Sequence, residues 1–232
     1  MDFREDEEQR LIRESIRKLC EGFPDDYWEQ HDREGKFPDE FFKEMASAGW
    51  IGIAIPEKYS GAGKGIQEAA IILEEVAASG AAMNGATPVH MSIFGMHPVV
   101  KHGSEAMRKK YLPPVARGEL HVAFGVTEPN AGSDAGNTQT NAVLEGDEYI
   151  VNGEKAFCTN AGEASVIIFT AVIVENGEEK GISAFVIDGD TQGMSLSPPE
   201  KKMGWCGSDT RSVFFKDMQI PKSAVLGDPS KG

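Results

Sequence analysis

Cysteine and histidine are scarce in this sequence. It contains three cysteines, Cys20, Cys158 and Cys206, and none of them forms a C-x-x-C pair. Reduced thiols in a cytosolic protein are therefore the simplest interpretation, and a disulfide framework is not expected. The five histidines form no metal signature, because His97 and His102 stand five residues apart, off the spacing that places two ligands on one helix face. We expect no metal site.

Long apolar runs and basic residues are also missing. No stretch approaches the roughly 18 apolar residues of a membrane span, and the charged start MDFREDEEQR has no signal-peptide core. The 23 Lys and Arg residues face 37 Asp and Glu residues, which gives a formal charge of -14. Nucleic acids and anionic membranes are bound mainly through basic residues. The sequence thus predicts a soluble, cytoplasmic protein that binds neither, and an anionic ligand would need a local pocket of backbone N–H groups or a few basic residues.

The first half of the chain has the periodicity of helices. Apolar residues recur on one helical face in four stretches. A short fifth helix is expected to begin at Ser104, a suitable N-cap, and to be broken by Pro113 and Pro114. We predict an all-α domain over residues 1–118. The four apolar stretches cover residues 11–20, 41–46, 66–77 and 88–101.

From about His121 the apolar pattern changes to that of strands, beginning with the alternation of Val122, Phe124 and Val126. Two Asn-Gly pairs predict two-residue hairpin turns, because both positions tolerate positive φ. We predict that residues 119–232 form an antiparallel β domain, either barrel-like or a sandwich, so that the fold class is α+β. The further expected strands are 165–174, 181–188 and 212–218, and the two pairs are Asn152-Gly153 and Asn176-Gly177.

A glycine-rich segment, YSGAGKG at 59–65, invites comparison with nucleotide-binding loops. A P-loop needs glycine six residues before Lys64, where this sequence has Lys58. A dinucleotide-binding fingerprint needs a preceding strand within a βαβ unit, whereas here a helix precedes the segment. We predict an ordinary tight loop between two helices.

The segment GVTEPNAGSD at 125–134 is of a different kind, because it follows a strand and is dense in small and hydroxyl residues. Gly132 lets a backbone approach a ligand closely, and Ser133 with free N–H groups can hold phosphate oxygens. By composition alone, a surface loop with Asx and Ser turns is the simpler interpretation.

The order of residues in this segment resembles the first signature of the acyl-CoA dehydrogenase family. The match runs from Gly125 through Asp134, and Asn137 departs from the family's usual Gly, Ser or Ala. The resemblance extends over the whole chain, to the family's helical N-terminal domain and its flavin-binding middle domain. Four further segments resemble the family in its own order: 49–63, 103–119, 152–161 and 202–210.

The resemblance implies that FAD lies extended against the β domain, with an acyl-CoA on the opposite side of the flavin ring. Thr159 would place its hydroxyl near flavin N5, and Phe157 would pack against the ring where many relatives have Trp. Gly132 and Ser133 would hold the pyrophosphate. The implied cofactor contacts are Phe124, Val126, Thr127, Gly132, Ser133, Phe157 and Thr159, and the implied substrate contacts are Ser133, Ser208 and Thr210.

The activity implied is α,β-dehydrogenation of an acyl-CoA thioester in fatty acid β-oxidation, with an electron-transferring flavoprotein as oxidant. A carboxylate removes the α proton while hydride passes to the flavin. The family's catalytic Glu belongs to a C-terminal helical domain that would lie beyond Gly232, so we assign no catalytic residue and expect the chain alone to be inactive. Glu128 is expected to order its loop and not to act as the base.

Three interpretations of the chain remain open. It is a fragment of an ordinary acyl-CoA dehydrogenase, or one subunit of a split enzyme whose partner supplies the helical domain, or a non-catalytic flavin- or CoA-binding or interaction module. A homo- or hetero-oligomer is expected. A flavin oxidase or monooxygenase on the same fold is a further alternative. Oxygen reactivity of the reduced flavin would distinguish these enzymes from a dehydrogenase.

Overall fold

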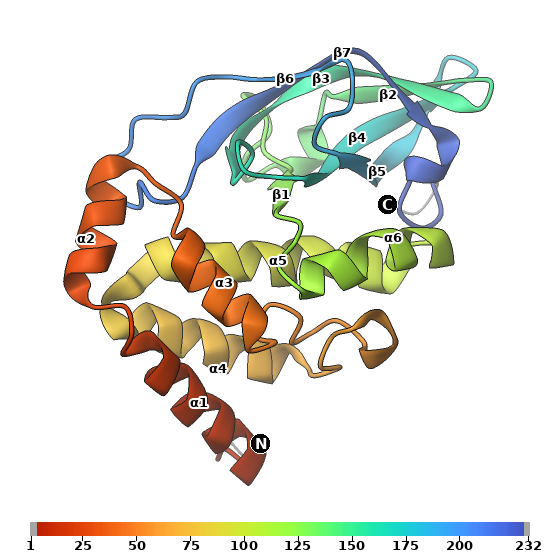
Figure 1. The fold of residues 1–232 in the computed structure, drawn as a ribbon. Helices are drawn as coiled ribbons and strands as arrows, with labels where there is room; N and C mark the ends of the chain where they lie inside the picture. Colours follow the sequence, from red (N-terminus) through yellow and green to blue (C-terminus); the bar gives the residue numbers. More distant parts are fainter. Residues whose placement is uncertain (1–3, 230–232) are drawn as a thin grey trace. The chain divides into compact units, whose positions relative to one another are not determined.

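The computed structural model describes residues 4–229 (Figure 1). The chain divides into two compact units that interleave along the sequence. The helical unit comprises the described residues up to His97 together with Leu112–Glu119 and Lys201–Ser208. The sheet unit comprises Pro98–Tyr111, Leu120–Glu200 and the described residues from Asp209 onward.

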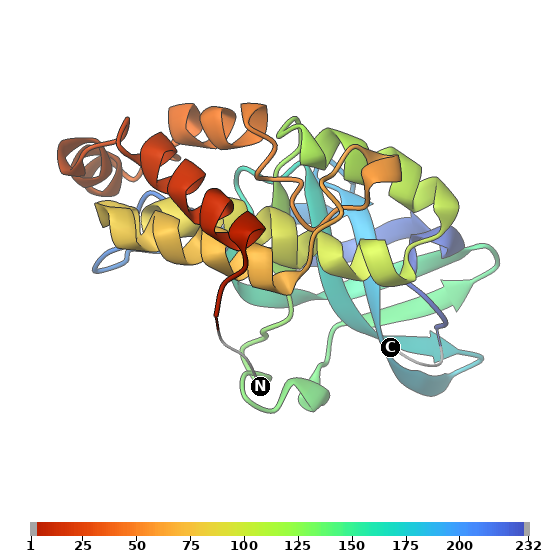
Figure 2. The same cartoon turned by 90° about the horizontal axis from the view of Figure 1, so that it is seen from below.

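Amphipathic helices build the helical unit. α1 begins with a capping box, in which the Asp6 carboxylate accepts from the Gln9 N–H at 2.8 Å, and it packs along α4 (Figure 2). Ile12 and Ile16 of α1 are buried, whereas Leu11, expected on the same face, is exposed. No helix between residues 4 and 229 is long and apolar enough to cross a bilayer. The helices are α1 (Glu7–Cys20), α2 (Asp25–Glu34), α3 (Asp39–Ser47), α4 (Ile66–Val76), α5 (Ala82–His102, which continues into the sheet unit) and α6 (Glu105–Ala116, shared by the two units).

Three helices differ from expectation. α2 was not predicted, because Trp28 is its one buried residue and it therefore shows no apolar stripe. α5 begins at Ala82, earlier than the expected start at 88. α6 continues through Pro113 and Pro114, so the prediction that this pair breaks the helix was wrong. Both prolines lie in its last turns. Their fixed φ is helical, and each costs the helix one hydrogen bond because it has no N–H.

The glycine-rich segment is a tight loop between α3 and α4, as predicted. It folds back on the chain just before it, where the Gly61, Ala62 and Gly63 N–H groups donate to the carbonyls of Pro56 (3.3 Å), Gly52 (3.0 Å) and Ile55 (2.8 Å), respectively. These bonds satisfy the backbone without any ligand.

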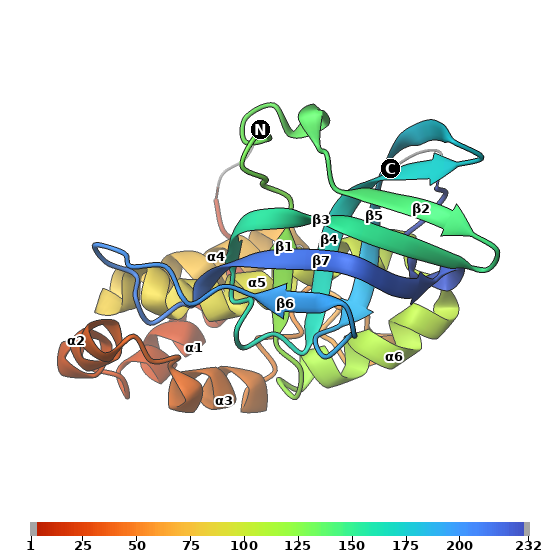
Figure 3. The ribbon, with the colours of Figure 1, turned by 90° about the horizontal axis from the view of Figure 1, so that it is seen from above.

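Among the described residues, seven strands form one sheet, in which β3 lies between β2 and β7 (Figure 3). β1 and β2 both pair with β4 in parallel, with Val122 opposite Val166 and Asn141 opposite Val172. The expected strictly antiparallel domain was therefore wrong in this detail, because periodicity identifies a strand but not the direction of its partner. The strands are β1 (Val122–Gly125), β2 (Asn141–Glu145), β3 (Glu148–Thr159), β4 (Val166–Glu175), β5 (Glu178–Asp188), β6 (Met194–Leu196) and β7 (Thr210–Pro221).

Only one of the two Asn-Gly pairs forms the predicted turn. Asn176-Gly177 forms the predicted turn between β4 and β5, with φ values of 54° and 77°. The hairpin predicted at Asn152-Gly153 was wrong, because β3 runs straight through the pair with a bulge at that point. Gly153 has φ of 144°, and a Cβ there would lie 2.6 Å from Thr140 Oγ1, so tertiary packing requires glycine.

The core of the sheet unit is aromatic. The Phe169 ring lies 5.3 Å from that of Phe185 and 4.5 Å from that of Phe215, and Tyr149 packs edge-on against Phe185. All four side chains are buried. This core supports the strand surface on which the sequence motifs lie.

Candidate functional site

Two of the motif segments, separated in sequence, lie side by side in the sheet unit. The Ala156 N–H donates to the Thr127 carbonyl at 2.8 Å. At the other end of this contact, the Asn160 side-chain amide donates to the Val122 carbonyl at 3.1 Å. The segment 122–127 therefore runs along the second half of β3.

The exposed side of these segments carries the side chains that were predicted to contact flavin. We call Phe124, Val126, Thr127, Phe157 and Thr159 the motif face. The ring of Phe157 is 67% exposed, although it is large and apolar, and the other four side chains are half-buried. This aromatic ring is therefore accessible to a ligand.

A bulge in β3 sets the direction of side chains in part of the motif face. The register with β7 shifts between Lys155 and Cys158, and Phe157 has φ of 53°. Bulges are frequent beside functional sites, because they change the direction in which a side chain points. Cys158 lies on the buried side, where burial raises the pKa of its thiol to about 12, so the thiol stays protonated.

The motif face and its neighbouring loop fit a large, partly polar cofactor such as FAD. Within residues 4–229, no hydrogen bond uses the hydroxyl of Thr127, Thr159 or Ser133. Gly132 is exposed with an ordinary φ, and a Cβ built there would meet no atom within 4 Å. The fold itself does not require glycine at this position, so the space beside Gly132 is open to a ligand.

A buried ion pair lies beneath the motif face. Lys155 Nζ is 2.6 Å from Glu128 Oε1, and the two side chains are 0% and 4% exposed. Lys155 also donates to the Val126 carbonyl at 3.3 Å and to Thr170 Oγ1 at 3.2 Å. Burial raises the pKa of Glu128, but the hydrogen bonds from Lys155, Thr140 and Gln139 outweigh it and hold the pKa below its ordinary value. The carboxylate is therefore ionised.

Glu128 orders its loop, as predicted. Its carboxylate accepts from the N–H groups of Gln139 at 2.7 Å and Thr140 at 3.1 Å. The role of Lys155 was not predicted, although the sequence carries a signal. Tyr149, Val151 and Lys155 share the parity of inward-facing positions on β3, so a lysine there needs a buried partner.

The residues predicted to contact substrate differ in their exposure. Ser133 is exposed on the loop beside the motif face. Thr210, the first residue of β7, lies opposite Thr159 in the β3–β7 register but is buried. Ser208 belongs to the helical unit and is also buried, and its hydroxyl has no hydrogen-bond partner among the described residues. Its segment is held by the Cys206 N–H, which donates to Asp32 Oδ1 at 2.6 Å.

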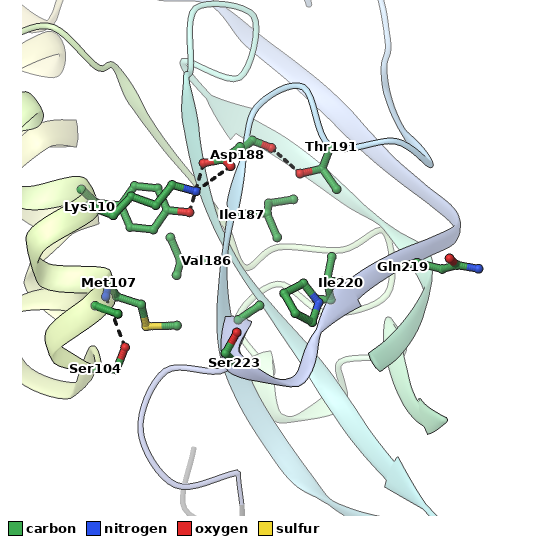
Figure 4. Close-up of a pocket in the computed structure, with 14 residues that line it drawn as sticks. Ser104, Met107, Lys110, Val186, Ile187, Asp188, Thr191, Gln219, Ile220 and Ser223 are labelled. Carbon is green, nitrogen blue, oxygen red and sulfur yellow. Dashed lines mark hydrogen bonds and ion pairs between the residues drawn. The ribbon is translucent and has the colours of Figure 1, made fainter. Parts of the chain in front are cut away.

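A separate cavity of about 270 Å³ lies in the sheet unit between α6 and the ends of β5 and β7 (Figure 4). Its charged groups are paired with each other, since Lys110 Nζ lies 2.7 Å from Asp188 and the Tyr111 hydroxyl donates to the same carboxylate at 3.0 Å. None of the five residues of the motif face lines it. Among the described residues no cluster of His, Cys, Asp or Glu is arranged to hold a metal ion.

A helical unit joined to a mixed sheet unit, with an exposed aromatic and hydroxyl face beside an open glycine loop, defines a class of α+β proteins with a candidate cofactor-binding face. Comparison with known proteins makes this class specific. The chain belongs to the acyl-CoA dehydrogenase family. The model of the family's N-terminal domain matches residues 6–119, and that of its middle domain matches residues 123–218.

Relatives match along the whole chain. A probable acyl-CoA dehydrogenase of Bacillus subtilis, YngJ, is 39% identical, and a short-chain specific acyl-CoA dehydrogenase of Clostridium acetobutylicum is 37% identical. Each alignment covers 100% of this chain and 61% of the relative. The chain thus spans about three fifths of the length of these relatives.

Solved structures agree with this assignment. Glutaryl-coenzyme A dehydrogenase in complex with glutaryl-CoA has a TM-score of 0.92 at 32% identity, covering 100% of this chain and 59% of that one. An acyl-CoA dehydrogenase of Bacillus anthracis complexed with FAD has a TM-score of 0.86 at 35% identity, covering 98% of this chain and 38% of that one. The family therefore includes complexes with FAD and with an acyl-CoA.

Proposed function

We propose that this chain provides the FAD-binding part of an enzyme that carries out α,β-dehydrogenation of an acyl-CoA thioester. The motif face carries this proposal, because it combines an exposed aromatic ring with hydroxyls that the protein's own hydrogen bonds leave unused. The open space at Gly132 and the FAD held by the Bacillus anthracis relative support the same choice of cofactor.

Each residue of the motif face has a proposed role. Phe124, Val126 and Phe157 bury the apolar flavin ring, which removes their surface from water. The Thr159 hydroxyl would donate to flavin N5, and backbone N–H groups near Thr127 would donate to the pyrimidine oxygen, because preorganised donors stabilise developing negative charge. Ser133 and the N–H groups around Gly132 hold the diphosphate. FAD, when bound, supplies the hydride acceptor.

The general base of the proposed reaction lies outside the described residues. Glu128 belongs to the signature motif, but its carboxylate is buried, paired with Lys155 and bonded to two backbone N–H groups. A carboxylate in this environment has no free path to a substrate proton. We propose that a further domain or a partner subunit of an oligomer supplies the base, that an electron-transferring flavoprotein reoxidises the flavin, and that the enzyme acts in the cytoplasm.

Anaerobic titration of the purified chain with FAD tests the proposal. We expect the visible flavin spectrum to shift on binding, and we expect no bleaching when acyl-CoA thioesters are added, because the proposed base lies outside the described residues. Failure of FAD to bind would contradict the proposal and favour a non-catalytic module. Bleaching by a thioester would place the base within this chain, and rapid reaction of the reduced flavin with oxygen would favour an oxidase or monooxygenase.

Thr159→Val tests the proposed contact with N5. In the enzyme assembled with its base-bearing part, we expect flavin reduction to slow by about tenfold or more, because one preorganised donor is lost. The affinity for FAD should change little. Thr191→Val is a matched control, since the Thr191 hydroxyl donates at 2.7 Å to the Asp188 carbonyl, away from the motif face. An unchanged reduction rate in Thr159→Val would remove this role.

A further inference from the structure

The loop at 129–138, which carries Gly132 and Ser133, is exposed along most of its length. Within 129–137, Ala131 is the one buried residue. A cleft of about 440 Å³ lies on the side of Pro129 and Asn130, and another of about 800 Å³ lies beside residues 136–139. The body of the loop is therefore largely exposed. The Asn137 side-chain amide donates across it to the Asn130 carbonyl at 3.1 Å, and its two ends are fixed by the residues that flank it.

Glu128 fixes both ends of this loop. It is the residue just before the loop, and its carboxylate receives the N–H groups of Gln139 and Thr140 just after it. Glu128 and Ala131 also exchange backbone hydrogen bonds of 3.0 and 3.1 Å at the start of the loop. One side chain thus closes the neck of a ten-residue loop.

Lys155 connects this closure to the motif face. It neutralises the Glu128 carboxylate at 2.6 Å and bonds the Val126 carbonyl at 3.3 Å. It also stands on β3 two residues before Phe157 and four before Thr159. The same buried pair therefore holds the two segments of the motif face and the loop in fixed positions.

We propose that Glu128 and Lys155 are positioning residues that hold the loop at 129–138 ready for the cofactor's diphosphate. This inference rests on the proposed binding of FAD. Neither side chain touches the cofactor, because both are buried beneath the surface that would hold it. Their effect is preorganisation: a loop already ordered in the free protein loses less conformational entropy when it binds.

Flavins with and without a diphosphate distinguish this role from general support of the fold. FAD carries the diphosphate and riboflavin does not. Loosening the loop should therefore weaken the binding of FAD and leave the binding of riboflavin nearly unchanged. We would measure the Kd of both flavins for Glu128→Gln and for the double variant Glu128→Leu with Lys155→Met. The double variant replaces the buried pair with apolar side chains of similar size, so it leaves no unpaired charge inside the sheet unit.

For FAD we expect Kd to rise about tenfold in Glu128→Gln and about 100-fold in the double variant, while the Kd of riboflavin changes by less than about threefold. Hydrogen exchange at the amides of Gln139 and Thr140 should accelerate in both variants. The matched controls are Glu178→Gln and the double variant Glu178→Leu with Lys180→Met. Their parent pair is 2.7 Å apart but exposed, at 74% and 37%, so neither flavin should be affected.

Each outcome decides the inference. A weaker affinity for FAD alone, together with faster hydrogen exchange at Gln139 and Thr140, supports it. Unchanged FAD affinity in both variants overturns it while leaving the proposed function intact. Equal loss of FAD and riboflavin also overturns it, because the pair then supports the fold in general. A wild-type chain that binds neither flavin overturns the proposed function and this inference together.

Discussion

Lys155→Met is expected to lower the free energy of unfolding by about 3–5 kcal/mol at neutral pH. The substitution leaves the Glu128 carboxylate buried without a counter-charge, with backbone N–H groups as its remaining partners. Urea denaturation followed by circular dichroism measures the effect. The double variant Glu128→Leu with Lys155→Met should recover much of the loss, because it removes the charge together with its partner.

The loss of stability in Lys155→Met should depend on pH in a defined direction. The pKa of Glu128 is lowered in the folded wild type, so its contribution is present at neutral pH and is lost as the pH falls through that folded pKa. Without Lys155, burial raises the pKa of this carboxyl. Protonation then relieves the unpaired charge, so the deficit of Lys155→Met should shrink as the pH falls below 7. A deficit below about 1 kcal/mol, or one that grows on acidification, would contradict this account of the pair.

Gly61→Ala is expected to destabilise the helical unit by about 3 kcal/mol or more. A Cβ at this position would lie 2.0 Å from the Ile55 carbonyl oxygen and 2.5 Å from its carbonyl carbon. These are backbone atoms, and Ile55 O also accepts the Gly63 N–H at 2.8 Å, so the loop must shift as a whole. The three tryptophans, Trp28, Trp50 and Trp205, all belong to the helical unit, and their fluorescence reports its unfolding.

Gly132→Ala is the matched control for this prediction. A Cβ there would meet no atom within 4 Å, so the free energy of unfolding should change by less than about 0.5 kcal/mol. Under the proposed function, Gly132→Ala should weaken the binding of FAD instead. Equal destabilisation by the two substitutions would contradict the distinction between a glycine required by packing and a glycine that leaves room for a ligand.

The sequence predicted the elements that depend on local pattern. Apolar periodicity separated the helical part from the strands, and Asn176-Gly177 forms the expected turn because both residues adopt positive φ on their own. The order of small and hydroxyl residues at 125–134 led to the correct family. α2 escaped prediction because a helix that buries Trp28 alone has no periodic signal.

The pairing of distant segments was decided by the tertiary structure. Asn152-Gly153 has the same local preference for a turn, yet β3 continues through it because β7 pairs along both of its halves. The parallel pairing of β1 and β2 with β4 likewise depends on partners far along the chain. So does the pairing of Lys155 with Glu128, 27 residues earlier. Sequence alone predicted which residues contact a cofactor, but only packing between remote segments placed residues 122–127 beside the second half of β3, since no local preference records contacts made at long range.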